Sequence, residues 1–135
     1  MIHLDTNYLI GLLVKGSAQA LEVGDWLAAG ESLAASAIAW TEFLNGPVAA
    51  PQMDQVMAVL QSRIVSFGPA EATLASELFN KTGRRRGSRF DCLIAATAIV
   101  AQAEVATANQ SDFGVFVPHG LKLAIPPPAV RTPPS

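Results

Sequence analysis

The amino-acid sequence predicts an α/β fold with a central, mainly parallel β-sheet flanked by helices. Two observations support this prediction: short apolar runs that favour strands alternate with longer segments of helical spacing, and hydrophobic residues make up 50% of the 135-residue chain. A chain of this length and apolar content folds as one domain around a buried core. Strands that alternate with helices favour parallel pairing, because a parallel crossover connection usually contains a helix.

Five short runs have the apolar or β-branched composition of strands. In chain order, the predicted strands cover residues 2–5, 33–36, 64–67, 105–108 and 115–117. The third, for example, begins with the β-branched pair Ile64 and Val65 and ends before Gly68 and Pro69, which favour a turn.

Six segments between these strands have apolar residues at helical spacing. In chain order, the predicted helices cover residues 8–14, 20–29, 38–44, 53–60, 70–79 and 91–103. The second would place Leu21, Trp26 and Leu27 on one side, and the last is the most apolar and is rich in alanine.

The pattern predicts one folded domain over residues 1–125 and a disordered tail over 126–135, which contains five of the nine prolines. The first residues lack the basic region of a secretion signal, and the longest uncharged apolar run, residues 92–103, is too short to span a membrane. The single cysteine excludes a disulfide framework within the chain and a multi-cysteine metal site. We therefore expect a cytoplasmic protein.

Four of the eleven acidic residues stand beside the predicted strands or inside the apolar helices. Asp5 ends the first strand, and Glu42 lies within an apolar helix. Asp91 begins the most apolar helix, and Asp112 follows the turn after the fourth strand. Each alone fits an ordinary role: a helix cap for Asp5 or Asp91, a solvent-facing position for Glu42, and a turn for Asp112.

Together, these carboxylates predict a divalent-metal site, because the carboxyl ends of parallel strands meet at one edge of a sheet. Crowded carboxylates repel one another unless a cation neutralises them. Oxygen ligands without a His or Cys cluster select Mg²⁺ or Mn²⁺ over zinc. Such a site suits phosphoryl chemistry, in which the metal binds phosphate oxygens and activates a water.

The net charge of −2 gives no support for nucleic-acid binding, so any such binding must come from a local patch. Five of the nine Lys and Arg residues fall within residues 81–89, which we call the basic segment. They are Lys81, Arg84, Arg85, Arg86 and Arg89. Beside a metal site this segment would bind a phosphodiester backbone, whereas alone it would be a solubilising loop.

Four motifs, in order, resemble those of PIN-domain ribonucleases, and in particular of VapC-type toxins of bacterial toxin–antitoxin pairs. They are Ile-His-Leu-Asp-Thr-Asn at 2–7, Ala-Trp-Thr-Glu-Phe-Leu-Asn-Gly at 39–46, Asp-Cys-Leu-Ile-Ala-Ala-Thr-Ala at 91–98 and Thr-Ala-Asn-Gln-Ser-Asp-Phe at 107–113. The resemblance extends from residue 1 to about residue 124. It implies the three-layer PIN fold, with a mainly parallel sheet between layers of helices.

The resemblance also implies roles for individual residues. Asp5 and Asp91 would be the principal metal ligands, and Glu42 would complete the metal site directly or through water. Thr6 would orient the site through its hydroxyl group. Family members carry Asn or Asp at the position of Asn109 and often Asp at that of Asp112, so the sequence leaves open which of the two fills the last site position.

The reaction implied by the resemblance is hydrolysis of an RNA phosphodiester bond by a Mg²⁺- or Mn²⁺-activated water, without a protein nucleophile. Relatives cut tRNA or rRNA, form homodimers and bind a VapB-like antitoxin. The same partners are therefore expected for this chain.

Three other functions compete with this interpretation. A phosphotransfer enzyme with Asp5 as its nucleophile is disfavoured, because Asn7 stands where the haloacid-dehalogenase pattern has a second Asp. A non-catalytic RNA- or protein-binding module is disfavoured, because it has no need for a set of buried carboxylates. A PIN-fold nuclease of RNA processing would carry the same catalytic residues and stays open; an antitoxin gene beside this one would favour the toxin.

Overall fold

The computed structural model describes residues 1–127. These residues form a five-stranded sheet in the order β3-β2-β1-β4-β5, in which every neighbouring pair is parallel. The strands are β1 (Ile2–Leu4), β2 (Leu33–Ser36), β3 (Ile64–Val65), β4 (Glu104–Ala106) and β5 (Lys122–Leu123). The predicted α/β fold with a parallel sheet is therefore confirmed.

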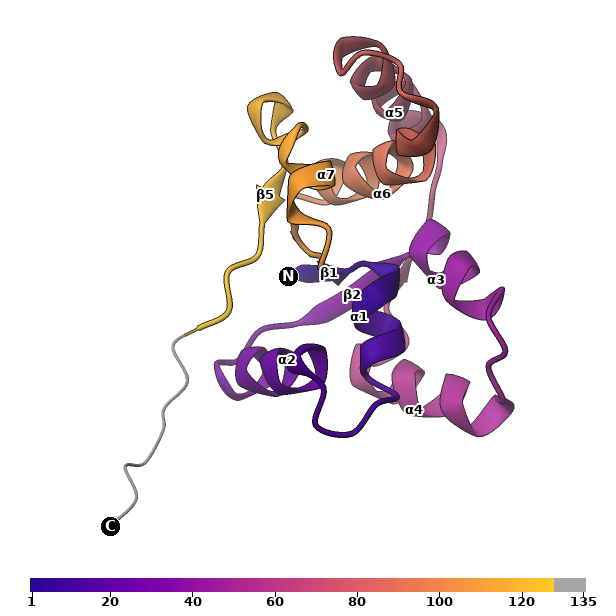
Figure 1. Cartoon of the computed structure of the whole chain (residues 1–135), viewed down its shortest axis with the longest axis vertical. Helices are drawn as coiled ribbons and strands as arrows, with labels where there is room; N and C mark the ends of the chain where they lie inside the picture. Colours follow the sequence, from indigo (N-terminus) through magenta and orange to yellow (C-terminus); the bar gives the residue numbers. More distant parts are fainter. Residues whose placement is uncertain (128–135) are drawn as a thin grey trace.

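The helices form two layers, one on each face of the sheet (Figure 1). The first layer connects β1, β2 and β3 and contains α1 (Thr6–Gly11), α2 (Ala18–Ala28), α3 (Ala37–Leu44) and α4 (Ala50–Leu60). The second layer follows β3 and contains α5 (Pro69–Lys81), α6 (Arg89–Val100) and α7 (Gln110–Gly114). The chain moves along the sheet in one direction up to β3 and then returns past β1, so right-handed crossovers place the two layers on opposite faces.

Several of these helices begin or end at residues that favour helix ends. The side-chain oxygens of Ser17 and Ser36 cap α2 and α3, because each accepts a 3.0 Å hydrogen bond from a backbone N–H in the first turn. Pro69 is the first residue of α5, where its missing N–H costs nothing. Gly83, with φ of 91°, reverses the chain after α5 and leads into the rest of the basic segment.

The core lies between the sheet and both helix layers. Leu4, Leu33 and Val105, from the three central strands, are 0% exposed. α6 packs against α5 and the sheet, and its small buried alanines at positions 95, 96 and 98 allow this close approach. This packing holds the ends of the central strands in fixed positions relative to one another.

The last part of the sheet differs from the sequence prediction. Residues 115–117 were expected to form a strand, but they connect α7 to a 3₁₀ turn (Val117–His119), and the last strand is β5. The reason is the spacing of Phe113 and Phe116: both are fully buried, and their rings pack edge to face with centroids 6.1 Å apart. Burial three residues apart requires helical backbone, which the expected alternation of a strand does not provide.

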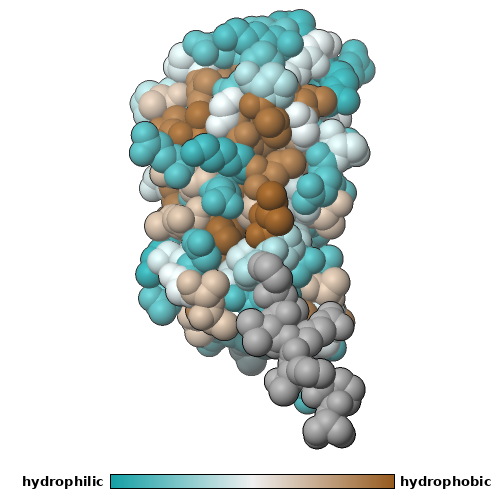
Figure 2. Space-filling model, turned by 90° about the vertical axis from the view of Figure 1, so that its left-hand side faces the viewer, coloured by the Kyte–Doolittle hydropathy of each residue, from teal (hydrophilic) through white to brown (hydrophobic). Residues whose placement is uncertain are grey.

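The predicted boundary between domain and tail stays a prediction, because residues 128–135 of the expected tail lie outside the described part of the chain. Before this point, the Trp26 indole N–H donates a 3.3 Å hydrogen bond to the Ile125 carbonyl. Figure 2 shows the adjoining face, where apolar surface lies between hydrophilic ends. No helix within residues 1–127 is long and apolar enough to cross a membrane.

Candidate active site

The carboxyl ends of β1 and β4 lie next to each other in the sheet. From β1 the chain continues to β2 and β3 on one side, and it later adds β4 and β5 on the other side, so the strand order reverses between β1 and β4. Sites in open parallel sheets form at the carboxyl ends of the strands at such a point. Asp5 follows β1 and Thr107 follows β4, and the Thr107 hydroxyl donates a 2.8 Å hydrogen bond to Asp5 Oδ2. This bond joins the two strand ends at the edge where the sequence predicts the site.

Asp5 is a buried carboxylate whose two oxygens are oriented by neighbouring donors. It is 4% exposed, and its Oδ1 accepts a 2.8 Å bond from the Thr6 backbone N–H, so that it also caps α1. Its Oδ2 accepts a 3.3 Å bond from the Asn7 amide in addition to the bond from Thr107. Burial raises the pKa of Asp5, while these hydrogen bonds lower it by favouring the charged form. The cap role and the site role therefore coexist in this residue.

Glu42 connects α3 to the same place. Its Oε1 accepts a 3.1 Å hydrogen bond from the Thr6 hydroxyl, and the side chain is half-buried. Burial raises the pKa of Glu42, the bond from Thr6 lowers it, and the negative charge of Asp5 raises it further. Glu42 therefore faces Asp5 instead of pointing only to solvent.

Asp91 is the carboxylate on which all of the other predicted carboxylates act. Its pKa is raised to about 6, mainly by burial and in addition by the nearby charges of Asp5, Asp112 and Glu42. Arg85 acts in the opposite direction. The alternative role of Asp91 as a helix cap is excluded, since α6 begins at Arg89 and Asp91 lies within its first turn. The acidic cluster, as we define it, consists of Asp5, Glu42, Asp91 and Asp112.

A polar pocket of about 300 Å³ opens beside Asp91 and is lined by Arg85, Gly87, Ser88, Asp91 and Asp112. Asp112 comes from α7, a short helix absent from the sequence prediction. Asn109 is not part of this lining; its backbone N–H donates a 3.0 Å hydrogen bond to the Thr107 hydroxyl. Of the two candidates for the last site position, the structure thus places Asp112 beside Asp91.

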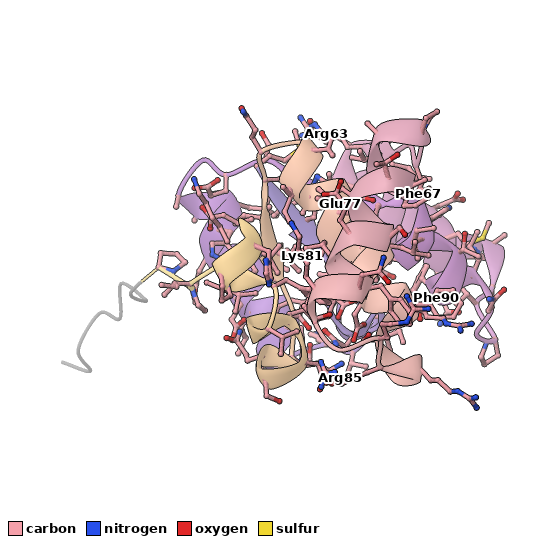
Figure 3. All side chains as sticks on the ribbon, turned by 90° about the horizontal axis from the view of Figure 1, so that it is seen from above. Arg63, Phe67, Glu77, Lys81, Arg85 and Phe90 are labelled. Atoms are coloured by element: carbon pink, nitrogen blue, oxygen red, sulfur yellow. The ribbon has the colours of Figure 1, made fainter. Side chains whose placement is uncertain are left out.

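The residues of the basic segment have different surroundings. The guanidinium groups of Arg84 and Arg89 lie over the Phe79 ring, 5.3 and 5.7 Å from its centroid. Arg85 lines the polar pocket, while Arg86 lies exposed in the 3₁₀ turn (Arg86–Ser88), and Lys81 ends α5. Figure 3 labels Lys81 and Arg85 on this part of the molecule.

Among the described residues, no carboxylate lies within ion-pair distance of a cation of the basic segment. Within residues 1–127, the one ion pair joins the amino terminus of Met1 to Glu31, at 4.0 Å. The positive charges beside the acidic cluster are therefore available to an external anion such as a phosphate.

The donor set of the acidic cluster fits a hard divalent cation held by few protein ligands. It contains only carboxylate oxygens, with the hydroxyl groups of Thr6 and Thr107 beside them. Within the described part of the chain, no three Asp, Glu, His or Cys side chains are placed so that together they could hold a metal ion. Mg²⁺ is usually bound by one or two carboxylates and several waters, so a complete cage is not required. Asp91 and Asp112 line one pocket, so these two carboxylates could supply protein ligands, with waters completing the shell.

Two residues support the site without having been assigned to it from the sequence. Thr107 donates to Asp5, and the Asn7 side chain bridges the strand ends, because its Nδ2 donates to Asp5 while its Oδ1 accepts a 3.1 Å bond from the Ala108 N–H. Both residues lie within the quoted motifs, directly after a strand or at the start of a helix. The sequence did contain a signal for Thr107, which is a polar residue near the end of the predicted strand over 105–108.

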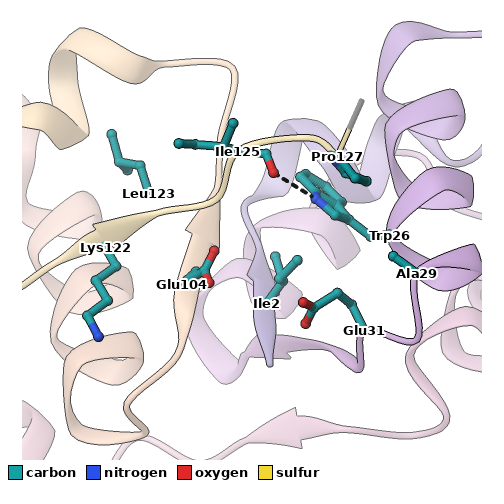
Figure 4. A pocket seen from close by; sticks show the side chains of 9 residues that line it. All are labelled: Ile2, Trp26, Ala29, Glu31, Glu104, Lys122, Leu123, Ile125 and Pro127. Atoms are coloured by element: carbon teal, nitrogen blue, oxygen red, sulfur yellow. Dashed lines mark hydrogen bonds between the residues drawn. The ribbon is translucent and has the colours of Figure 1, made fainter. Parts of the chain in front are cut away.

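A second pocket, of about 360 Å³, lies at the opposite edge of the sheet (Figure 4). Its lining includes Ile2, Glu104 and Lys122, which are the first residues of β1, β4 and β5. The acidic cluster is at the other ends of these strands. The charged groups of this pocket therefore take no part in the candidate active site.

A parallel α/β sheet with an acidic cluster at its carboxyl edge defines the class of protein. The chain belongs to the PIN domain family, since the family model of the PIN domain matches residues 2–114, which include the whole acidic cluster. PIN domains are generally nucleases. A comparison with curated proteins gives no match.

Solved structures show the same fold. The chain is similar to FitAcB from Neisseria gonorrhoeae, with 23% identity, a TM-score of 0.69 and coverage of 93% of this chain and 98% of that chain. VapBC2 from Rickettsia felis, bound to a DNA fragment from its promoter, is 23% identical with a TM-score of 0.69 and coverage of 92% and 98%. A toxin–antitoxin complex from Klebsiella pneumoniae is 26% identical, with a TM-score of 0.65 and coverage of 84% and 90%.

Proposed function

We propose that this chain is a metal-dependent endoribonuclease and the toxin of a toxin–antitoxin pair. The observation that carries the proposal is the gathering of carboxylates from four separate places in the chain. Asp91 and Asp112 line one pocket, Glu42 is bonded to Thr6 beside Asp5, and the charges of Asp5, Glu42 and Asp112 all raise the pKa of Asp91. Carboxylates kept close together at a cost in electrostatic energy are typical of a site that binds a cation.

The chain's own residues have separable tasks in this reaction. Asp5 and Asp91 would be the principal ligands of Mg²⁺ or Mn²⁺, and Glu42 and Asp112 would complete the site directly or through water. Thr107 fixes the direction in which the Asp5 carboxylate presents its oxygens. The bound ion would supply stabilisation of charge on the phosphate oxygens and a lowered pKa for the attacking water. Arg85, at the rim of the same pocket, binds the phosphate to be cut.

RNA is the proposed substrate because the basic segment offers charge to a phosphodiester chain. Its cations form no ion pair with a carboxylate in the described residues. One of them, Arg85, lines the same pocket as Asp91 and Asp112 of the acidic cluster. A chain with a net charge of −2 would otherwise repel nucleic acid, so the contacts with RNA would concentrate on this segment. We propose tRNA or rRNA as the RNA class, as the family resemblance implies.

The toxin role and the partners are proposed on the structural relatives. FitAcB and VapBC2 are similar over nearly their entire length to this chain, and a further relative is described as a toxin–antitoxin complex. We propose a VapB-like antitoxin as the protein partner, a homodimer as the assembly of the chain, and the cytoplasm as its location.

The deciding experiment is cleavage of total cellular RNA by the purified protein with Mg²⁺ or Mn²⁺. EDTA and Asp91→Asn should each abolish cutting, because the first removes the metal and the second a principal ligand. Asp54→Asn, an exposed acid on α4, is the matched control and should cut normally. Absence of cutting by a folded protein that also fails to bind Mn²⁺ would refute the nuclease and favour a non-catalytic binding module.

A second experiment separates a toxin from a nuclease of RNA processing. Induced expression of the wild-type chain in a bacterial host should arrest growth, whereas Asp91→Asn should not. Normal growth with an enzyme that cuts RNA in vitro would assign the chain to RNA processing.

A further inference from the structure

Phe90 is an exposed aromatic ring directly beside the acidic cluster. The side chain is 59% exposed, and it stands in the first turn of α6 between Arg89 and Asp91. In Figure 3, Phe90 lies on the right-hand side of the view, nearer to Arg85 than to Arg63. Neither the acidic cluster nor the basic segment, as described above, requires an aromatic ring at this position.

The ring forms one wall of a pocket between α6 and α3. The pocket has a volume of about 350 Å³ and is lined by Ile38, Thr41, Glu42, Asn45 and Phe90. The lining residues from α3 are spaced by three or four positions, so they form a single stripe on the helix that faces Phe90. We call this cavity the Phe90 pocket.

The Phe90 pocket is connected to the acidic cluster through a shared side chain. Glu42 lines the pocket, and it also accepts the hydrogen bond from Thr6 beside Asp5. Asp91 follows Phe90 directly in the chain. A ligand in this pocket is therefore adjacent to a phosphate held at the acidic cluster.

The chemistry of the walls suits a planar, partly polar ring. Phe90 and Ile38 provide apolar surface, and the exposed Asn45 amide carries both a donor and an acceptor at the end of α3. A volume of about 350 Å³ is at the lower end of the range for small-ligand pockets, roughly 300–1,000 Å³. A folded partner or a helix would need a longer groove.

We propose that the Phe90 pocket binds one unpaired base of the RNA, next to the phosphate that is cut, with the base stacked on the Phe90 ring. Aromatic rings beside cations are the general means of holding single-stranded nucleic acid, because every base has a π face. The basic segment supplies these cations immediately before Phe90 in the chain. This inference rests on the proposed ribonuclease function and adds a base subsite to it.

The test is a double-mutant cycle between the ring and the base. In an Asp91→Asn background, which leaves the RNA intact, binding is measured by fluorescence anisotropy. The RNA is a short single strand that spans the mapped cleavage site, with an abasic nucleotide placed at each position in turn. The protein variants are Phe90→Leu, which stays apolar, Phe90→Tyr, which restores an aromatic ring, and Leu21→Ala, which alters a 63% exposed residue of α2 as the matched control.

Phe90→Leu should weaken binding of intact RNA about tenfold. One abasic position should weaken binding to the parent protein by a similar factor and should add no further loss to Phe90→Leu. Phe90→Tyr and Leu21→Ala should bind like the parent. In protein with Asp91 restored, Phe90→Leu should raise KM more than it lowers kcat, since stacking binds the substrate and the transition state alike.

Losses that add independently at every abasic position would overturn the base subsite, even if the protein cuts RNA normally. Unchanged RNA affinity together with a changed native mass of Phe90→Leu would assign the pocket to contact between copies of the chain, and would also overturn it. A wild-type protein that neither cuts nor binds RNA would refute both the subsite and the proposed function.

Discussion

Replacing His3 with leucine should remove a large part of the acid sensitivity of this fold. His3 lies in the middle of β1, is 1% exposed, and has no hydrogen-bond partner for either ring nitrogen among the described residues. Burial lowers its pKa from 6.5 to about 4, and the charge of the amino terminus contributes. Between these pH values the unfolded state binds more protons than the folded state, so the free energy of unfolding decreases as the pH falls.

The expected size of the effect follows from the two pKa values of His3. Each unit of difference corresponds to about 1.36 kcal/mol, so lowering the pH from about 7.5 to about 4.5 should cost ~2.5 kcal/mol through this one group. Asp91 acts in the opposite direction, because its pKa is raised in the folded state and its protonation there stabilises the fold. His3→Leu leaves Asp91 in place, so the difference between variant and wild type isolates His3.

Urea unfolding of both proteins at about pH 7.5 and about pH 4.5 measures this difference. The free energy of unfolding of His3→Leu relative to wild type should increase by ~2.5 kcal/mol at the lower pH. His119→Leu is the matched control, since it makes the same replacement at an exposed position. Parallel pH dependences of wild type and His3→Leu would refute the assignment of this acid sensitivity to a buried, unpaired imidazole.

Three further predictions concern the site. Thr107→Val leaves the Asn109 N–H without its acceptor and leaves Asp5 Oδ2 with only the longer bond from Asn7. It should therefore destabilise the fold by about 1–3 kcal/mol and slow RNA cleavage, while Thr107→Ser should restore both; equal unfolding midpoints in urea would contradict this. Changing the three arginines at positions 84, 85 and 86 to alanine should weaken RNA binding and reduce the slope of log affinity against log salt by about 2, unless the segment only solubilises the chain. Mn²⁺ affinity, measured by calorimetry, should fall about tenfold per pH unit below about pH 6, because protons compete for Asp91; a flat profile would exclude Asp91 as a ligand.

The elements with strong local signals were predictable from the sequence. The predicted strand over 33–36 coincides with β2, and the helix predicted over 38–44 differs from α3 by one residue at its start. α7 was not predictable in the same way, because a five-residue helix has too few positions to display a period. The apolar residues that follow α7, at 115–117, were therefore mistaken for a strand.

In the acidic cluster, too, some features could be predicted from the sequence and others depend on the tertiary structure. Asp5, Glu42 and Asp91 could be proposed from the sequence because each interrupts or borders an apolar run, which is a local feature. That Asp112, and not Asn109, lines the polar pocket depends on how α7 packs in the fold. The support from Thr107 was hidden for a different reason, since its hydrogen bond joins residues 102 positions apart.

By itself, the sequence determined the alternation of strands and helices, the burial of the central strands and the set of carboxylates available to the site. These properties follow from the spacing of apolar and polar residues over one or two turns of chain. Only the tertiary structure decided that β1 lies between β2 and β4, that Thr107 therefore orients Asp5, and that Phe90 faces α3 across a pocket. The physical reason is that such contacts depend on which elements, distant in the sequence, pack together. Side-chain packing in the core sets that arrangement, and no local sequence pattern encodes it.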